Sequence, residues 1–574
     1  MGDALNKQTI ALPPALAGAL AEAQSAWLSA GNTRRLWRKD AALWTGTDEG
    51  QWLGWLDVVG AEQRDAANLQ EFGRELAAEH FTDALLLGMG GSSLGPEVLA
   101  QSLGSAPGHP TLRVLDSTDP DRIGRFEQGL DLTRTLIIVA SKSGTTLEPN
   151  VLMDYFWAQT TAVAGKNAGR RFVAITDPGS RLQKTGEERG FRRIFLGVPT
   201  IGGRFSVLSK FGLVPLAATG HDVRAFLDDA AAMAHACRPE QPAAENPGVA
   251  LGLAIGVLAA AGRDKLTLFT SPSIAAFGAW VEQLVAESTG KGGRGVIPIA
   301  DEPPGKVSDY GADRLFVYLR DAECAVAAQD QIVDALERSG QPVVRIGVAP
   351  ETLAQEFFRF EIATAVAGAI LGINPFDQPD VEASKVATRE MTTAFEKTGA
   401  LPSAPALFEG HGIALFADAG NAQELRRRGA GATIASWMKA HFSRLAGGDY
   451  FALLAFLDAT DARMQALQGL RATVRDRTKV ATALQIGPRF LHSTGQAHKG
   501  GPDNGVFLQI TAQPVHDLPI PGYAASFGVV EAAQAGGDFR VLTERGRRIL
   551  HAHIAGDVDA GIAALSAAAR SALE

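Results

Sequence analysis

The sequence is short of cysteine, of net positive charge and of long apolar runs, and each shortage excludes a class of protein. Its 574 residues include only Cys237 and Cys324, whose spacing fits no metal-binding motif, so we expect two reduced thiols. The 54 Lys and Arg residues are outnumbered by 63 Asp and Glu, which argues against a nucleic-acid binder. No run approaches the roughly 20 apolar residues of a membrane span. The first residues lack a basic region followed by an apolar stretch, so we expect no signal peptide and a cytoplasmic location.

From residue 83 onward, short apolar runs alternate with helical patterns. A first series contains DALLLG (83–88) and TLIIVA (135–140), and a second contains KLTLFT (265–270) and RLFVYLRD (314–321). Such alternation is typical of α/β proteins, and we predict two doubly wound, mostly parallel sheets in three-layer αβα units. The predicted organisation is an N-terminal helical segment, two α/β domains and a C-terminal α/β extension packed with the second sheet, at residues 1–70, 71–240, 241–400 and 401–574.

Two polar loops follow predicted strands. GMGGSSLG (88–95) follows the first strand, and SKSGTTLE (141–148) follows TLIIVA. In parallel sheets ligands bind at the carboxyl ends of strands, where glycines and the start of a helix favour anions. No GxxxxGK[ST] motif occurs, so a phosphorylated small molecule suits these loops better than a nucleotide. Helix capping explains any one hydroxyl of the second loop but not four within six residues, and Lys142 is equally well explained as a solvated side chain. The loops predict substrate contacts from Gly91, Ser141, Lys142, Ser143, Thr145 and Thr146.

The two loops resemble those of SIS (sugar isomerase) domains, and three further segments are similar to glucose-6-phosphate isomerases. IGGRFSVLSKFGLVP (201–215) resembles that family's first signature and INPFDQPDVEASK (373–385) its second. VAESTGKGGRG (285–295) resembles the segment that carries the catalytic glutamate. The whole chain is most similar to the isomerase half of the bifunctional transaldolase/glucose-6-phosphate isomerases. We expect no transaldolase barrel in it, because about 80 residues before the first loop are too few for one.

The resemblance implies two SIS domains and the interconversion of glucose 6-phosphate and fructose 6-phosphate, a reaction of glycolysis and gluconeogenesis. Removing a proton next to a carbonyl needs a close base and a fixed cation, and no metal or redox cofactor is expected. The implied roles are phosphate binding by Ser92, Ser141, Ser143 and Thr146, proton transfer by Glu287, enediolate stabilisation by Arg204, substrate binding by Gln378, and ring contact and ring opening by Lys385. Structural alternatives are a solvated or capping Glu287, a salt-bridged Arg204 and an ion pair of Lys385 with Glu382.

The family's ring-opening histidine is missing from its usual place, since no histidine occurs between His235 and His411. FLHSTGQAHKGG (490–501) resembles the family's histidine segment and precedes an apolar run, but it follows the second signature. We therefore predict that the tail belongs to the second sheet and that His492 takes the missing position, with a surface loop as the alternative. Secondary candidates for phosphate or surface contacts are His498 and Lys499.

Other assemblies and functions remain open. In dimeric members of the family the histidine comes from the partner subunit, so the resemblance implies a homodimer, with a monomer as the alternative if His492 reaches its own site. SIS domains also serve as sugar-phosphate sensors, but a sensor need not keep Glu287, Arg204 and Lys385, and no helix-turn-helix segment is evident. A third hypothesis is an isomerase for another hexose 6-phosphate, such as mannose 6-phosphate or an amino-sugar phosphate.

Overall fold

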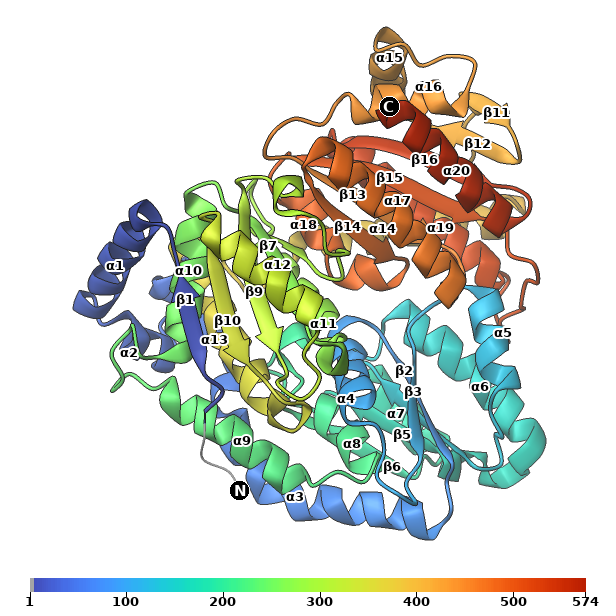
Figure 1. Ribbon diagram of the computed structural model, residues 1–574. Helices are drawn as coiled ribbons and strands as arrows, with labels where there is room; N and C mark the ends of the chain where they lie inside the picture. The colour runs from blue at the N-terminus through green and yellow to red at the C-terminus, as the bar shows by residue number, and fades with distance from the viewer. Residues whose placement is uncertain (1–4) are drawn as a thin grey trace.

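The computed structural model describes residues 5–574, so the first four residues of the predicted N-terminal segment lie outside the described part. Three α/β units, each with its own β-sheet flanked by helices, lie side by side (Figure 1). The first two units share one hydrophobic core, and the C-terminal unit packs against both. The predicted α/β class with mostly parallel sheets is confirmed, although the structure has three sheets rather than the two predicted.

The first sheet is parallel throughout and has the strand order β3-β2-β4-β5-β6. Along β2, Ala84 and Leu86 face one core while Leu85 and Leu87 face the other. Because both faces of the sheet are covered, its central strands β2, β4 and β5 are continuous apolar runs rather than alternating ones. The strands are β2 (Asp83–Gly88), β3 (Thr111–Leu115), β4 (Thr135–Ala140), β5 (Phe172–Thr176) and β6 (Arg193–Leu196).

The second sheet has the order β1-β10-β9-β7-β8, with β1 antiparallel and the other strands parallel. The N-terminal segment therefore supplies an edge strand as well as the helices α1 (Pro14–Ser29) and α3 (Trp55–Ala78). Sequence patterns missed β1 because it is only four residues long and pairs with a strand far along the chain. The strands are β1 (Gln8–Ala11), β7 (Lys265–Thr270), β8 (Ile297–Ile299), β9 (Arg314–Arg320) and β10 (Val343–Gly347).

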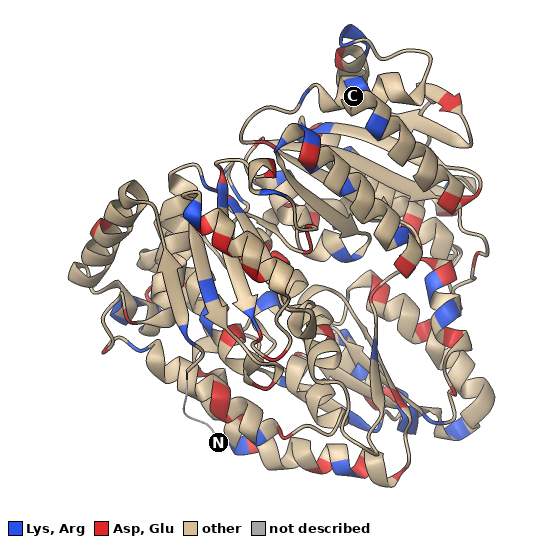
Figure 2. Cartoon of the chain, viewed as in Figure 1, with Lys and Arg blue, Asp and Glu red and all other residues tan. Residues whose placement is uncertain are grey.

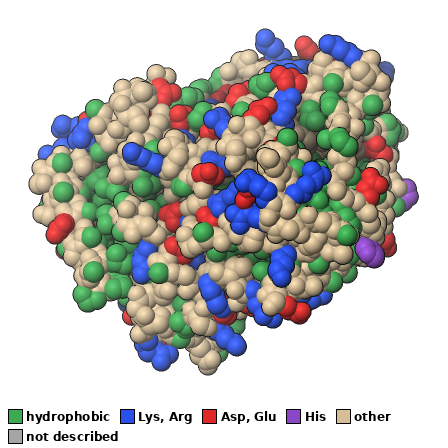
Figure 3. Space-filling model, turned by 90° about the horizontal axis from the view of Figure 1, so that it is seen from above, with side chains coloured by type: hydrophobic (Ala, Val, Ile, Leu, Met, Phe, Trp, Pro, Cys, Tyr) green, Lys and Arg blue, Asp and Glu red, His purple; other side chains and the backbone are tan. Residues whose placement is uncertain are grey.

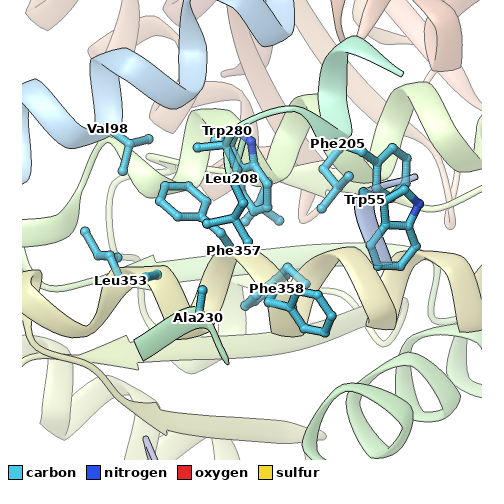
Figure 4. Close-up of a cluster of buried hydrophobic side chains, with 14 of the residues drawn as sticks. Trp55, Val98, Phe205, Leu208, Ala230, Trp280, Leu353, Phe357 and Phe358 are labelled. Atoms are coloured by element: carbon cyan, nitrogen blue, oxygen red, sulfur yellow. The ribbon is translucent and has the colours of Figure 1, made fainter. Parts of the chain in front are cut away.

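Aromatic side chains join the first two units (Figure 4). Trp280 of α11 (Phe277–Thr289) meets Phe357 of α13 (Leu353–Leu371) edge to face, with ring centroids 4.8 Å apart. Trp55 of α3 stacks on Phe205 at 5.2 Å. Such pairs add about 0.5–1.5 kcal/mol each beyond their buried area. Because Phe205 follows Arg204 directly and α11 contains Glu287, this core fixes two segments that carry predicted site residues.

The C-terminal extension forms a sheet of its own, in the order β11-β12-β16-β15-β13-β14, so the prediction that the tail belongs to the second sheet is wrong. The extension packs on the second sheet instead, through Ile297 and Ile299 of β8 against Tyr450 and Ala481. A reason lies in the short edge strand β8, where Pro298 has no N–H to offer another strand. The strands are β11 (Phe408–Gly410), β12 (Ile413–Phe416), β13 (Tyr450–Phe456), β14 (Ala481–Ile486), β15 (Gly505–Ala512) and β16 (Arg548–Ile554).

The surface mixes charges of both signs. Basic and acidic residues are interspersed along the chain in Figure 2, and the face in Figure 3 mixes apolar, basic and acidic groups. Within residues 5–574, no helix has the length and apolar character needed to cross a membrane. Over the same residues, no three His, Cys, Asp or Glu side chains group in a way that would hold a metal ion.

Candidate active site

A cavity of about 490 Å³ lies among the three units. Eleven of the twelve predicted site residues line it, although they come from segments spread over some four hundred positions of the chain. Thr145 is the exception and lines an adjoining cavity. The eleven are Gly91, Ser92, Ser141, Lys142, Ser143, Thr146, Arg204, Glu287, Gln378, Lys385 and His492.

Glycines of the first loop bring three segments into contact. Gly91 lies in the short helical turn η3 (Gly90–Ser92), where a Cβ atom would come 1.9 Å from the carbonyl oxygen of Gly203. Gly90 has a φ of +56°, and a Cβ there would come 2.7 Å from the carbonyl oxygen of His492. Side chains at these positions would push the arginine turn and the tail away from the cavity. The two glycines therefore let the site assemble.

The second loop offers hydroxyls at the start of a helix. Thr146 is the N-cap of α6 (Leu147–Ala164) but makes no side-chain capping bond, so capping does not occupy its hydroxyl. The hydroxyl of buried Ser141 lies 3.4 Å from that of Thr146. Lys142 forms an ion pair with Asp177 and donates to the carbonyl oxygen of Pro199 at 3.1 Å, so it is not simply a solvated lysine. Hydroxyls and the helix start together favour an anion here.

Arg204 is held rigidly beside Glu287. It lies in the turn η5 (Gly203–Phe205) and is 2% exposed. Its Nη1 lies 3.1 Å from Glu287 Oε1 and donates to Gln378 Oε1 at 2.9 Å, while its Nε donates to Ser288 Oγ at 2.7 Å. Burial lowers the pKa of Arg204 and the charge of Glu287 opposes that shift, but an arginine stays protonated in proteins. The site thus contains a fixed cation next to a carboxylate.

Gln283 holds the other oxygen of that carboxylate. Its Nε2 donates to Glu287 Oε2 at 3.0 Å and to the carbonyl oxygen of His492 at 2.9 Å. The sequence analysis missed this residue. Its position one helical turn before Glu287 on α11 was the available signal, since residues four apart share a helix face. Gln283 therefore links the glutamate to the tail.

Lys291 is a second residue that sequence reasoning missed. Its Nζ donates to the carbonyl oxygen of Asn374 and to Asp377 Oδ1, both at 2.6 Å, and also to the carbonyl oxygen of Asp377. Arg204 binds the same loop through the carbonyl oxygens of Pro375 and Asp377. Burial, reinforced by the charge of Arg204, lowers the pKa of Lys291 to about 7. Lys291 thus fixes the loop that leads to Gln378.

His492 lines the cavity and belongs to a mostly buried segment, so the alternative of a surface loop is wrong. That it takes the place of the family's missing histidine stays a prediction. His492 ends the turn η9 (Arg489–His492), and its Nε2 lies 2.8 Å from Glu148 Oε1. Gln534 also donates to Glu148 Oε1, at 2.6 Å. Burial favours the neutral form of Glu148, but the charge and hydrogen bond of His492 outweigh it and lower the pKa of Glu148. Glu148, the last residue of SKSGTTLE, was not among the predicted residues.

Buried polar contacts fasten this tail segment to the rest of the site. Arg489 pairs with Glu97 and Asp116 of the first unit, each at 2.7 Å. Gln496, on α18 (Gly495–Gly500), donates to the carbonyl oxygen of Gly290 and to Asp380 Oδ2. A buried ion pair that loses one partner costs about 3–5 kcal/mol, so the position of His492 is strongly defined.

The secondary candidates lie elsewhere. His498 is buried, its Nδ1 is 2.9 Å from the Tyr450 hydroxyl, and burial lowers its pKa to about 3. Lys499 is buried in an ion pair with Asp538 at 2.6 Å. The prediction that these two residues make phosphate or surface contacts is therefore wrong, because both complete the interior of the C-terminal unit.

Lys385 lies both at the cavity and beside an acidic residue. It lines the cavity from α14 (Pro379–Thr398) and also lies 3.4 Å from Glu382, the ion pair given as its structural alternative. Its side chain is 43% exposed, and an exposed pair of this kind is worth at most about 1 kcal/mol. So weak a contact leaves the ammonium group able to reach a ligand.

Comparison with known proteins adds an independent finding. The family model described as phosphoglucose isomerase matches residues 68–303. A probable glucose-6-phosphate isomerase of Methanococcus maripaludis is 30% identical over 383 residues, covering 59% of this chain and 84% of that protein. The glucose-6-phosphate isomerase of Rubrobacter xylanophilus is 31% identical over 370 residues, covering 55% of this chain and 83% of that protein.

Solved structures agree on the fold. A hypothetical protein of Thermus thermophilus matches with a TM-score of 0.57 and 26% identity, covering 67% of this chain and 99% of its own. A glucose-6-phosphate isomerase of Chlamydia trachomatis matches with a TM-score of 0.50 and 23% identity, covering 60% of this chain and 75% of its own. Parallel sheets whose loops and signatures meet at one cavity define a phosphosugar isomerase fold. The chain belongs to the glucose-6-phosphate isomerase family. Its resemblance to the bifunctional transaldolase enzymes stays a prediction.

Proposed function

We propose that this protein interconverts glucose 6-phosphate and fructose 6-phosphate, first opening the sugar ring and then moving a proton between C1 and C2 through a cis-enediol(ate). The observation that carries the proposal is the pair of Glu287 and Arg204, 3.1 Å apart, on the wall of a cavity that His492 also lines. A sensor would need the phosphate loops but not this arrangement. In this isomerisation one carbon of the sugar is oxidised while its neighbour is reduced, so no external oxidant or reductant is needed.

The phosphate is bound by the two loops. Ser92, Ser141, Ser143 and Thr146 supply hydroxyls around the start of α6, and the free N–H groups of that helix add to the attraction for an anion. Gly91 lets the turn that carries Arg204 pack against the first loop. Lys142 adds positive charge at the same place, although Asp177 partly offsets it. Holding the phosphate positions the reacting carbons near Glu287.

Ring opening is assigned to His492 and Lys385. Ionised Glu148 accepts the Nε2–H of His492, which fixes the tautomer and stabilises the imidazolium. The other ring nitrogen delivers a proton to the ring oxygen as the bond from that oxygen to the anomeric carbon breaks. The neutral imidazole that remains then accepts the proton that the anomeric hydroxyl loses as the carbonyl forms. Positioned acid–base catalysis of this kind is worth about 10²–10⁴-fold. Lys385 and Gln378 are assigned to sugar contacts.

Proton transfer is assigned to Glu287. Its carboxylate removes the proton from the carbon next to the carbonyl and returns it to the neighbouring carbon. Gln283 and Arg204 hold its two oxygens, so it acts from a defined position. Arg204 stabilises the negative charge of the enediolate, and as a buried, already oriented cation it needs no reorganisation.

The test is turnover of fructose 6-phosphate, with the glucose 6-phosphate formed detected by its dehydrogenase. We expect wild-type turnover and a loss of about 10²–10⁴-fold in Glu287→Gln. Glu282→Gln is the matched control, because Glu282 lies on the same helix but bonds to Ala300 N and Gln485 instead. No wild-type turnover, or equal turnover in Glu287→Gln, would contradict the proposal. The homodimer, the cytoplasmic location and the three domain boundaries stay predictions.

A further inference from the structure

A second cavity, of about 370 Å³, adjoins the candidate active site. It lies between the start of α6, the helix α14 and the tail, and its lining includes Thr145. Thr146, Val381, Lys385 and His492 line both cavities. Figure 1 shows α14 beside α19 (Phe527–Glu544) of the C-terminal unit, on the side that faces α6. The volume is within the range of about 300–1,000 Å³ typical of small-molecule sites.

Three basic side chains line this second cavity. Lys385 and Arg389 lie one turn apart on α14, and Arg181 begins α7 (Arg181–Glu188). Within residues 5–574, neither Arg181 nor Arg389 has a carboxylate as an ion-pair partner, and both are exposed. Lys385 has only its weak contact with Glu382. Uncompensated guanidinium groups around a concave site favour a phosphate, which they bind through paired hydrogen bonds.

Two carboxylates also line the cavity, but each already has a basic partner: Glu148 lies next to His492 and Glu382 next to Lys385. Polar groups without charge complete the lining. Ser384 is 2% exposed, and its hydroxyl has no hydrogen-bond partner in the described chain. A buried hydroxyl without a partner is costly, at about 1–3 kcal/mol, and a ligand in the cavity would supply one. Asn150 and Tyr523 add an amide and a phenol to the same wall. Such groups match the hydroxyls of a sugar.

We propose that this cavity is an accessory site for a second sugar phosphate, whose phosphate binds Arg181 and Arg389. The inference rests on the proposed function, since the ligand is taken from the same chemical class. An occupant would contact Lys385 and His492, which also line the catalytic cavity. Binding at the two cavities is therefore coupled, and the coupling acts equally in both directions.

The test is calorimetric titration of fructose 6-phosphate into the full chain carrying Glu287→Gln, which stops turnover. We expect two binding events. Adding Arg181→Gln and Arg389→Gln should weaken one event at least about tenfold, equivalent to about 1.4 kcal/mol, and leave the other in place. The matched control adds Arg74→Gln and Arg570→Gln, two exposed arginines outside both cavities, and should keep both events.

A single event before the arginines are changed would overturn the accessory site. The accessory site would also be overturned if both binding events stay unchanged after Arg181→Gln and Arg389→Gln are added. Loss of both events together would overturn it as well, because the two cavities would then be one site. Failure of the proposed function is separate. If the wild type shows no turnover but two binding events are found, the isomerase function is refuted and the accessory site is kept. If the wild type shows turnover but only one binding event is found, the isomerase function is kept and the accessory site is refuted.

Discussion

The site contains two pairs of a carboxylate with a basic side chain, and the carboxylate has a different role in each pair. On one side Glu287 pairs with Arg204 at 3.1 Å, within the segment that the family model matches. On the other side Glu148 pairs with His492 at 2.8 Å, and the histidine comes from the C-terminal unit, beyond that segment. In the first pair the cation is permanently charged, so the carboxylate is the group that can react. In the second pair the nitrogen partner is an imidazole, a side chain that acts as a general acid and base, so the carboxylate is the fixed partner.

The largest effect that separates the two sides is expected from His492→Ala. Turnover of fructose 6-phosphate should fall about 10²–10⁴-fold, because ring opening loses its acid. Exchange of the C1 proton of 5-deoxyfructose 6-phosphate, which lacks the hydroxyl that closes the ring, should change little. Glu287→Gln should slow both reactions by about 10²–10⁴-fold. Solvent deuterium incorporation followed by NMR checks this, and an equal loss on both substrates in His492→Ala would remove the distinction.

Glu148→Gln should have an intermediate effect on the same side. The pKa of Glu148 lies below its ordinary value, so the carboxylate is ionised at neutral pH and its partnership is lost only as pH falls through that lowered pKa. A charged partner is worth about 1–3 pKa units to a titrating group. The alkaline limb of the pH–rate profile should therefore move down by at least about one unit. Glu127→Gln, which affects a bond to Tyr155, is the control, and an unmoved profile in Glu148→Gln would contradict the assignment.

Lys291→Met tests the side of the site that contains Glu287 and Arg204, because Lys291 binds the loop that leads to Gln378. Removing the donor to the loop before Gln378 should lower kcat/KM by about 10–10²-fold through misplacement alone. The pKa of Lys291 in the folded protein is lowered to about 7, so above that pH the unfolded chain binds more protons at this residue than the folded protein does. Lys291 therefore makes the free energy of unfolding rise between about pH 7 and about pH 10. Denaturant midpoints measured across that window should rise less in Lys291→Met. An identical pH dependence in both proteins would refute the shift.

The smallest effect is expected from Thr145→Ala. Thr145 lines the accessory cavity rather than the catalytic one, so turnover at low substrate should change by no more than about twofold. Ser141→Ala is the matched comparison, and its KM should rise about tenfold or more, because it loses a hydrogen bond to a charged phosphate. Steady-state kinetics on both variants check the contrast. A larger effect at Thr145 would place the phosphate on the other side of the loop.

The parts of the site that the sequence could predict are local ones. Gly91, Ser141, Arg204 and Glu287 stand in continuous motifs at strand ends, turns or one helix, and the parallel sheet brings such ends together. The central strands of the first two sheets, such as β2, β4, β7 and β9, were equally visible, because each is a buried apolar run. These features depend on short segments, so patterns along the chain suffice to find them.

The parts that escaped prediction depend on distant contacts. Glu148 acquires its role from a histidine far along the chain, and the pairing of the tail strands with one another cannot be read from any single strand. Thr145 and Thr146 have the same chemistry, but only Thr146 reaches the catalytic cavity. Thr146 precedes the helix with an extended backbone, in which successive side chains point to opposite sides. His498 and Lys499 lie close to His492 in sequence, but burial in the C-terminal unit removes them from the site.

The central claim is that the tail of each chain completes that chain's own site, and complementation tests it most directly. Chains carrying Glu287→Gln are co-expressed with chains carrying His492→Ala, and fructose 6-phosphate turnover is measured on the purified mixture. The account predicts no more activity than the sum of the two variants, because His492 bonds to Glu148 of its own chain. Recovery toward about a quarter of wild-type activity, the share of intact sites expected if chains pair at random and exchange the histidine, would contradict it.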